Sequence, residues 1–272
     1  MTKIPKERVD VLLVERGLIE TREKAKRAIM AGTVYTNENR LEKPGEKVTI
    51  DTPLQVKGND LRYVSRGGLK LEKALHYFGI DVEGKLMIDI GASTGGFTDC
   101  ALQNGARHCY ALDVGYNQLA WKIRQDERVT VMERTNFRYV TPADLATGMP
   151  DFATIDVSFI SLKLILPVLK TLLVPGSNVI ALVKPQFEAG KENVGKKGVV
   201  RDPKIHVAVL EKIAHFAQDA GFTLQNASFS PITGGEGNIE FLFHLLAEQS
   251  EEPVFKYEQL KNLVNEAHES LT

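Results

Sequence analysis

Several residues that could bind a ligand or do chemistry directly follow short apolar runs of the sequence. Apolar runs of this length, alternating with helical segments, are typical of parallel strands that are buried on both faces. In such sheets ligands bind beyond the carboxyl ends of the strands, so the residues at these ends should line one crevice. These residues are Gly91, Asp113, the neighbours Glu133 and Arg134, Asp156 and Lys184.

The apolar run 86–90 leads at once into a glycine-rich turn, Gly91-Ala92-Ser93-Thr94-Gly95-Gly96. A dinucleotide-binding turn would need another glycine at position 93, where this chain has Ser93. The spacing Asp89-x-Gly91-x-x-x-Gly95 resembles instead the first motif of S-adenosylmethionine-dependent methyltransferases. Its glycines would admit the methionine tail, and Asp113 would accept the ribose hydroxyls. The glycine pattern leaves two alternatives open, namely another nucleotide or a turn that serves only tight packing.

The residues expected to contact S-adenosylmethionine lie around this turn, at the end of the second strand and just after the third strand. The two cysteines, Cys100 and Cys109, show no metal-ligand spacing, so we expect no metal site. Two isolated thiols fit a reducing cytoplasmic compartment best. The expected cofactor contacts are Asp89, Gly91, Ala92, Ser93, Gly95, Gly96, Asp113, Arg134 and Asn136.

Lys184 is the most informative of the strand-end residues because it follows five consecutive apolar residues. A lysine at the end of a buried strand is costly unless it is paired or desolvated for a purpose. Asp156, at the end of the neighbouring strand, is its expected partner. The pair could be purely structural, or the lysine could act as a base, since burial and a nearby cation lower the pKa of an amine.

The N-terminal part of the chain differs from the rest in charge. Residues 1–66 carry 14 Lys and Arg against 10 Asp and Glu, a net charge of +4, whereas the remainder carries 20 against 25. A polyanion should therefore bind toward the N-terminus. Helices are expected at 9–16 and 22–31, and short strands at 34–36 and 47–50 around the polar turn 37–39.

The pattern Thr-Arg-x-x-Ala-x-x-x-Ile-x-x-Gly-x-Val-x-x-Asn, which begins at Thr21, resembles the alpha-L RNA-binding motif. The alternative is an ordinary solvated helix face. The resemblance implies that basic residues of the helix 22–31 contact RNA, with one more arginine near the domain junction. These residues are Arg22, Lys24, Lys26, Arg27 and Arg66.

The whole chain has 272 residues, 43% of them apolar and 25% charged, which is typical of a globular protein of one or two domains. Strands that alternate with helices predict an α/β fold: a doubly wound, Rossmann-like methyltransferase sheet, mainly parallel with an antiparallel last strand, after a small α+β domain. The expected domains are 1–60, a joining segment 61–84 and 85–272. Charged residues and Pro175 interrupt the most apolar stretch, 162–183, so no membrane span or signal segment is expected.

Four charged residues match, in order, the Lys-Asp-Lys-Glu tetrad of FtsJ-like 2′-O-ribose methyltransferases: Lys70, Asp156, Lys184 and Glu240. Together with the alpha-L motif and the phrases Val-Ser-Arg-Gly-Gly-x-Lys-Leu and Val-Lys-Pro-Gln-Phe-Glu, the chain resembles the TlyA family. Proteins of this family carry both haemolysin and ribosomal RNA methyltransferase names. The resemblance implies methyl transfer to a ribose 2′-hydroxyl, often of cytidine, in ribosomal RNA. Glu240 would hold either Lys70 or the ribose.

Other activities fit the sequence less well. Methylation of a base amine typically uses Asn/Asp-Pro-Pro-aromatic after the fourth strand, where this chain has Asp156-Val157-Ser158-Phe159. Methylation of carbon needs a nucleophilic cysteine after the fourth or a later strand, and neither cysteine is placed there. A membrane-lytic haemolysin would need a basic amphipathic or spanning helix. An RNA-binding protein without catalysis would not need all four tetrad residues.

Overall fold

The computed structural model describes residues 5–19, 21–30, 32–37, 39–41, 43–56, 62–250 and 254–271. The chain forms two compact units, Met1–Leu61 and Arg62–Thr272. Some sequence-based expectations fall outside the described residues: Ala31 at the end of the second helix, Glu38 in the turn 37–39, and residues 57–61 before the second unit.

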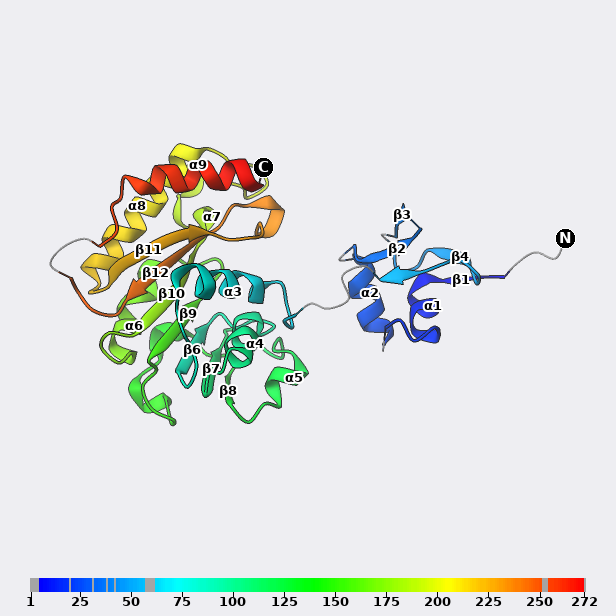
Figure 1. The fold of residues 1–272 in the computed structure, drawn as a ribbon, viewed down its shortest axis with the longest axis horizontal. Coiled ribbons are helices and arrows are strands. Elements are labelled where there is room, and N and C mark those ends of the chain that lie inside the picture. The colour runs from blue at the N-terminus through cyan, green and yellow to red at the C-terminus, as the bar shows by residue number, and fades with distance from the viewer. Residues whose placement is uncertain are drawn as a thin grey trace. The chain divides into compact units, whose positions relative to one another are not determined.

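The first unit packs two helices with short strands around a small apolar core that includes Val9, Leu13, Ala25 and Ile29 (Figure 1). The expected strands near 34–36 and 47–50 are present, but they do not pair with each other. β2 pairs with β3 and β5, whereas β4 pairs with β1, so the described residues of this unit form two separate sheets. The bounds are β1 Lys6–Arg8, α1 Val9–Glu15, α2 Arg22–Met30, β2 Val34–Thr36, β3 Asn39–Arg40, β4 Lys47–Thr49 and β5 Gln55–Val56.

The second unit is built on a seven-stranded sheet of order β11-β12-β10-β9-β6-β7-β8 (Figure 1). The last strand along the chain, β12, is antiparallel to both of its neighbours, β10 and β11. The remaining neighbouring strands are parallel, as the sequence predicts. The bounds are β6 Leu86–Ile90, β7 His108–Leu112, β8 Val129–Met132, β9 Phe152–Ile155, β10 Asn178–Val183, β11 Thr223–Phe229 and β12 Phe241–Leu246.

Helices cover both faces of this sheet because side chains alternate between the faces along each strand. In β6, Met87 packs in a cluster with α3 and α4, whereas Ile88 belongs to the cluster that includes α6, α8 and α9. Between β7 and β8 the chain forms a short helix, α5, that begins at Trp121, and another short helix, α7, directly follows Lys184. The bounds are α3 Gly67–Phe78, α4 Gly96–Gln103, α5 Trp121–Arg124, α6 Leu166–Leu172, α7 Pro185–Glu188, α8 Pro203–Asp219 and α9 Gln259–Leu271.

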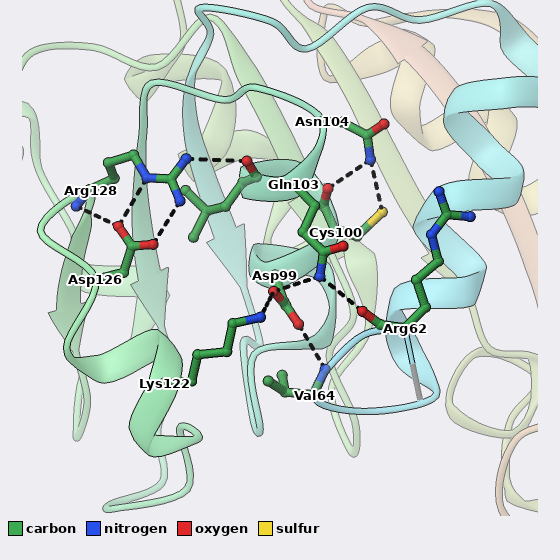
Figure 2. A network of polar contacts seen from close by, with 10 residues as sticks. Arg62, Val64, Asp99, Cys100, Gln103, Asn104, Lys122, Asp126 and Arg128 are labelled. Atoms are coloured by element: carbon green, nitrogen blue, oxygen red, sulfur yellow. Dashed lines mark hydrogen bonds and ion pairs between the residues drawn. The ribbon is translucent and has the colours of Figure 1, made fainter. Parts of the chain in front are cut away.

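The segment that precedes α3 is fastened to α4 by a buried carboxylate (Figure 2). Asp99 of α4 accepts hydrogen bonds from the backbone N–H of Val64 (2.8 Å) and from the side chains of Gln103 (3.0 Å) and Lys122 (3.1 Å). The first residue of α4 is Gly96, and a Cβ atom there would collide with Ser65 and approach the backbone of Gly68. The lack of a side chain at this position lets α3 begin against α4, which fixes the position of Lys70.

Candidate active site

The four residues of the sequence-predicted tetrad come together in the second unit. Lys70 lies on α3, Asp156 directly follows β9, Lys184 directly follows β10, and Glu240 directly precedes β12 rather than lying within it. Lys70 Nζ is 2.6 Å from Glu240 Oε2 and 3.9 Å from Asp156 Oδ2. Lys184 Nζ is 2.5 Å from Asp156 Oδ1 and donates a hydrogen bond to Ser158 Oγ at 3.0 Å.

These side chains form a row of alternating charge, Glu240–Lys70–Asp156–Lys184. The exposed fractions of Lys70, Lys184 and Glu240 are 8%, 9% and 2%, so the row is largely removed from water. Ion pairs of this kind need good geometry and further hydrogen bonds to offset desolvation. A buried cluster with two amines and two carboxylates can orient a hydroxyl group and redistribute its proton, because both donors and acceptors are held in place.

Two adjoining cavities surround the row. One, of about 630 Å³, is lined by the tetrad together with Arg66 and part of the glycine turn. The other, of about 350 Å³, is lined by residues that include Asp113 and Asn136. Both volumes are within the usual range for small-molecule sites, about 300–1,000 Å³. The residues that line both cavities are Gly91, Ser93, Asp156, Ser158 and Phe159.

The glycine turn closes the sheet side of these cavities. Gly91 has a φ of +87°, and a Cβ atom there would collide with the backbone carbonyl oxygen of Asp156. The ends of β6 and β9 therefore approach each other only because residue 91 lacks a side chain. Asp113 accepts hydrogen bonds from the backbone N–H groups of Ser93 (2.8 Å) and Gly115 (2.7 Å). An ionised carboxylate has further lone pairs, so Asp113 can still accept ribose hydroxyls.

Some of the residues expected to contact the cofactor line one or both of these cavities, and others line neither. Gly91, Ser93, Asp113 and Asn136 line the smaller cavity, and Ala92 and Gly96 join Gly91 and Ser93 in the larger one. The others, Asp89, Gly95 and Arg134, line neither cavity: Gly95 faces Leu119, and the Arg134 guanidinium lies 4.0 Å from the ring centre of Tyr116.

Asp89 is fully buried beneath the turn. Its carboxylate accepts hydrogen bonds from the backbone N–H and hydroxyl of Thr98 (3.0 and 2.7 Å) and from the hydroxyl of Thr154 (2.8 Å). Burial raises the pKa of this carboxyl group to about 6. Asp89 thus joins β6 to α4 and β9, and it supports the turn from below.

The expected RNA-binding residues lie in both units. Arg22 Nε is 3.0 Å from Asp10 Oδ2, so this arginine contributes to the packing of α2 on the buried end of α1. Lys26 Nζ is 3.6 Å from Glu23, and Lys24 and Arg27 are exposed on α2. Arg66 belongs to the second unit, where it is exposed and lines the larger cavity.

Two aromatic residues and one amide beside the tetrad were not expected from the sequence. Phe159 is 90% exposed with a φ of +62°, and its ring centre lies 4.9 Å from that of Phe187. Gln186 Oε1 is buried without a hydrogen-bond partner among the described residues, and this side chain lines the larger cavity. The sequence places Phe159 three residues after Asp156, but nothing local predicts that its ring is exposed at a cavity.

This arrangement defines a class of protein. A seven-stranded sheet with an antiparallel last strand, a glycine turn after β6 and an acid after β7 is the S-adenosylmethionine-dependent methyltransferase fold. The chain belongs to the FtsJ-like methyltransferase family, whose model matches residues 63–246, and an S4 domain model matches residues 7–52. These matches confirm the fold and the family that the sequence motifs predict.

Known relatives agree with this assignment. YqxC of Bacillus subtilis, named as a proposed rRNA methyltransferase, is 70% identical over 98% of this chain and 95% of its own length. TlyA of Mycobacterium tuberculosis, named a 16S/23S rRNA (cytidine-2′-O)-methyltransferase, is 44% identical over 88% of this chain and 89% of its own.

Among solved structures, a protein of Streptococcus thermophilus described as a proposed hemolysin is 57% identical, with a TM-score of 0.79 and 98% of each chain covered. Within the described ranges of the present chain, no helix combines the length and the apolar composition needed to cross a membrane.

Proposed function

We propose that this protein transfers the methyl group of S-adenosylmethionine to a ribose 2′-hydroxyl of cytidine in ribosomal RNA. The observation that carries the proposal is the buried row Glu240–Lys70–Asp156–Lys184 at the junction of the two cavities. The name of the Mycobacterium tuberculosis relative supports the nucleotide and the kind of RNA. The reaction belongs in the cytoplasm, where ribosomal RNA is available.

The bound cofactor supplies a methyl group on a positively charged sulfur. When bound, it would lie in the smaller cavity, where Asp113 and Asn136 would hold the ribose and the glycine turn would leave room for the methionine tail. Transfer is an in-line displacement, so correct placement of the hydroxyl oxygen accounts for much of the acceleration. In this proposal the acceptor hydroxyl is placed in the larger cavity, which contains the tetrad.

Lys184 is the residue that holds the acceptor. Its amine binds the 2′-hydroxyl oxygen, and the hydroxyl proton passes to the Lys184–Asp156 pair as the bond from the oxygen to the methyl carbon forms and the methyl–sulfur bond breaks, with a neutral thioether as the leaving group. Asp156 orients Lys184 at 2.5 Å and stabilises the positive charge that the amine gains with the proton. Lys70, which is itself paired with Glu240, lies 3.9 Å from the other carboxylate oxygen of Asp156 and keeps this carboxylate from turning away from Lys184.

The RNA is bound by features outside the tetrad. The exposed Phe159 and the half-buried Phe187 line the larger cavity with aromatic rings, which suits stacking on an unpaired base. In this proposal residues 1–60 form the RNA-binding domain, residues 61–84 join the domains and provide Lys70, and residues 85–272 carry the cofactor. Arg22, Lys24, Lys26, Arg27 and Arg66 provide phosphate contacts.

The test is methyl transfer in vitro. Purified protein and S-adenosylmethionine are incubated with ribosomal RNA and with ribosomal subunits that lack the modification, and the digested RNA is mapped by mass spectrometry. We expect one added methyl group on the ribose of a cytidine. Methylation of a base, or no transfer to any ribosomal RNA, would overturn the proposal. Lysis of red cells by both the wild-type protein and a Lys184→Ala variant would favour a haemolysin activity instead.

A further inference from the structure

The loop 156–162 provides several walls of the proposed acceptor site, and its conformation is unusual. It contains Asp156 and Ser158, which both contact Lys184, and Phe159, whose φ of +62° lies in the left-handed region. A bulky residue adopts this region only where the surrounding structure holds it there. The question is therefore which contacts fix the loop.

The beginning of the loop is held by Lys184, through the contacts to Asp156 (2.5 Å) and Ser158 (3.0 Å). The end of the loop is held by Glu188. Glu188 Oε2 accepts a hydrogen bond from the Ser161 hydroxyl at 2.6 Å, and Oε1 accepts one from the backbone N–H of Leu162 at 2.7 Å. Both fastening residues lie in the segment 184–188, so one short piece of chain holds the loop on either side of Phe159.

Glu188 is well suited to this task. It is 5% exposed, and each of its two carboxylate oxygens accepts a hydrogen bond from the loop. Its own backbone is anchored as well, because Lys212 of α8 donates a hydrogen bond to the Glu188 carbonyl oxygen at 2.9 Å. Glu188 does not line either cavity, so its effect on a ligand must be indirect.

We propose that Glu188 is a positioning residue for methyl transfer: it fixes the loop 156–162 so that Phe159 and Ser158 face the acceptor and Asp156 stays beside Lys184. The inference rests on the proposed 2′-O-methyl transfer for its effect on rate. Its effect on the loop does not depend on the identity of the substrate.

The hydrogen bonds of Glu188 matter here more than its charge. Burial raises the pKa of its carboxyl group, so the surroundings disfavour the ionised form. A glutamine can keep both contacts, since its oxygen can accept from Leu162 and its amide can donate to the Ser161 hydroxyl. Glu188→Gln should therefore keep the two hydrogen bonds to the loop that Glu188→Ala removes. Glu192→Ala, an exposed glutamate four residues later, is the matched control.

The first measurement is hydrogen exchange of the full-length protein, followed over the peptide that covers 156–163. Glu188→Ala should accelerate exchange there at least tenfold, because the Leu162 N–H loses its acceptor, whereas Glu188→Gln and Glu192→Ala should match the wild type. Unchanged exchange in a folded Glu188→Ala variant would overturn the proposal. This measurement tests the role of Glu188 in fixing the loop even if the wild type transfers no methyl group to RNA. The absence of methyl transfer would overturn only the proposed function.

The second measurement is single-turnover methyl transfer at saturating RNA and cofactor. Glu188→Ala should lower the rate roughly 10- to 100-fold with an unchanged Kd for S-adenosylmethionine, and Glu188→Gln should recover most of the loss. In a Phe159→Ala background the effect of Glu188→Ala should shrink, because the two changes act on one loop. Glu188 would have only a general structural role if Glu188→Ala lowered the rate equally in both backgrounds. The same would hold if the loss of rate only followed the loss of thermal stability.

Discussion

At the scale of single residues, Lys184 is the sharpest test of the proposed chemistry. Lys184→Ala should lower the rate of methyl transfer by roughly 10²–10⁴, the usual contribution of a positioned acid or base. Cofactor affinity should hardly change, because the loss is confined to the transition state. Lys184→Arg keeps a cation beside Asp156 but should not restore activity, since a guanidinium does not release its proton. Single-turnover kinetics measure this, and transfer at the wild-type rate would leave Lys184 as an ion-pair residue only.

Asp113 tests the placement of the cofactor. Asp113→Ala should weaken binding of S-adenosylmethionine by about 1.5–3 kcal/mol, the range for hydrogen bonds to a charged group. Part of the loss will come from the turn itself, because Asp113 also accepts from Ser93 and Gly115. Isothermal calorimetry gives the affinity, with Asp219→Ala, an exposed acid at the end of α8, as the control. Unchanged affinity in a folded Asp113 variant would contradict the assignment.

At the scale of elements, the buried carboxylate of Asp10 connects α1 to the strand before it and to α2. It accepts hydrogen bonds from Arg8 (2.8 and 2.9 Å) and from Arg22 (3.0 Å). The hydrogen bonds from Arg8, more than any other cause, lower the pKa of Asp10 from its ordinary value of 3.8 to about 2. Because the folded-state pKa is the lower one, the stabilisation is complete above about pH 4 and is lost as the pH falls toward 2.

Asp10→Asn should remove this pH dependence from the first unit. In the full-length protein, denaturant unfolding can be followed at pH 4 and pH 2.5 through the methyl NMR signals of Val9 and Leu13, both in the core of this unit. The wild type should lose more stability than the variant between the two pH values. Equal losses would show that Asp10 is not the group responsible.

At the scale of the whole molecule, the first unit should provide most of the RNA affinity, and the second unit should bind the cofactor and carry out the chemistry. Deletion of residues 1–61 should abolish tight RNA binding and spare cofactor binding. Calorimetry measures the cofactor affinity, and an unchanged affinity also shows that the remaining unit is folded. RNA affinity of the full chain should fall steeply between 50 and 200 mM salt, as about one counterion is released per phosphate contact. Fluorescence anisotropy with labelled RNA tests both, and a truncated protein with full RNA affinity would refute the division.

The sequence alone was sufficient to predict that several candidate site residues lie close together at one edge of the sheet. Apolar runs that alternate with helices require a doubly wound parallel sheet, and in such a sheet the carboxyl ends of the strands share one edge. Gly91, Asp113, Asp156 and Lys184 each follow a strand directly, so their neighbourhood follows from their place in the chain. The family motifs added Lys70 and Glu240, which are 170 positions apart and form an ion pair at 2.6 Å.

Other features were decided only by tertiary structure, because they depend on which elements lie next to each other. The spacing of Asp89 matches a cofactor motif, whereas the hydrogen bonds that its carboxylate accepts from threonines of α4 and β9 are visible only in the tertiary structure. The strand near 47–50 was predicted from composition, but its pairing with β1 depends on how the first unit folds. The loop on either side of Phe159 forms hydrogen bonds with the segment 184–188, about 25 or more positions away, and no local pattern of residues encodes these contacts.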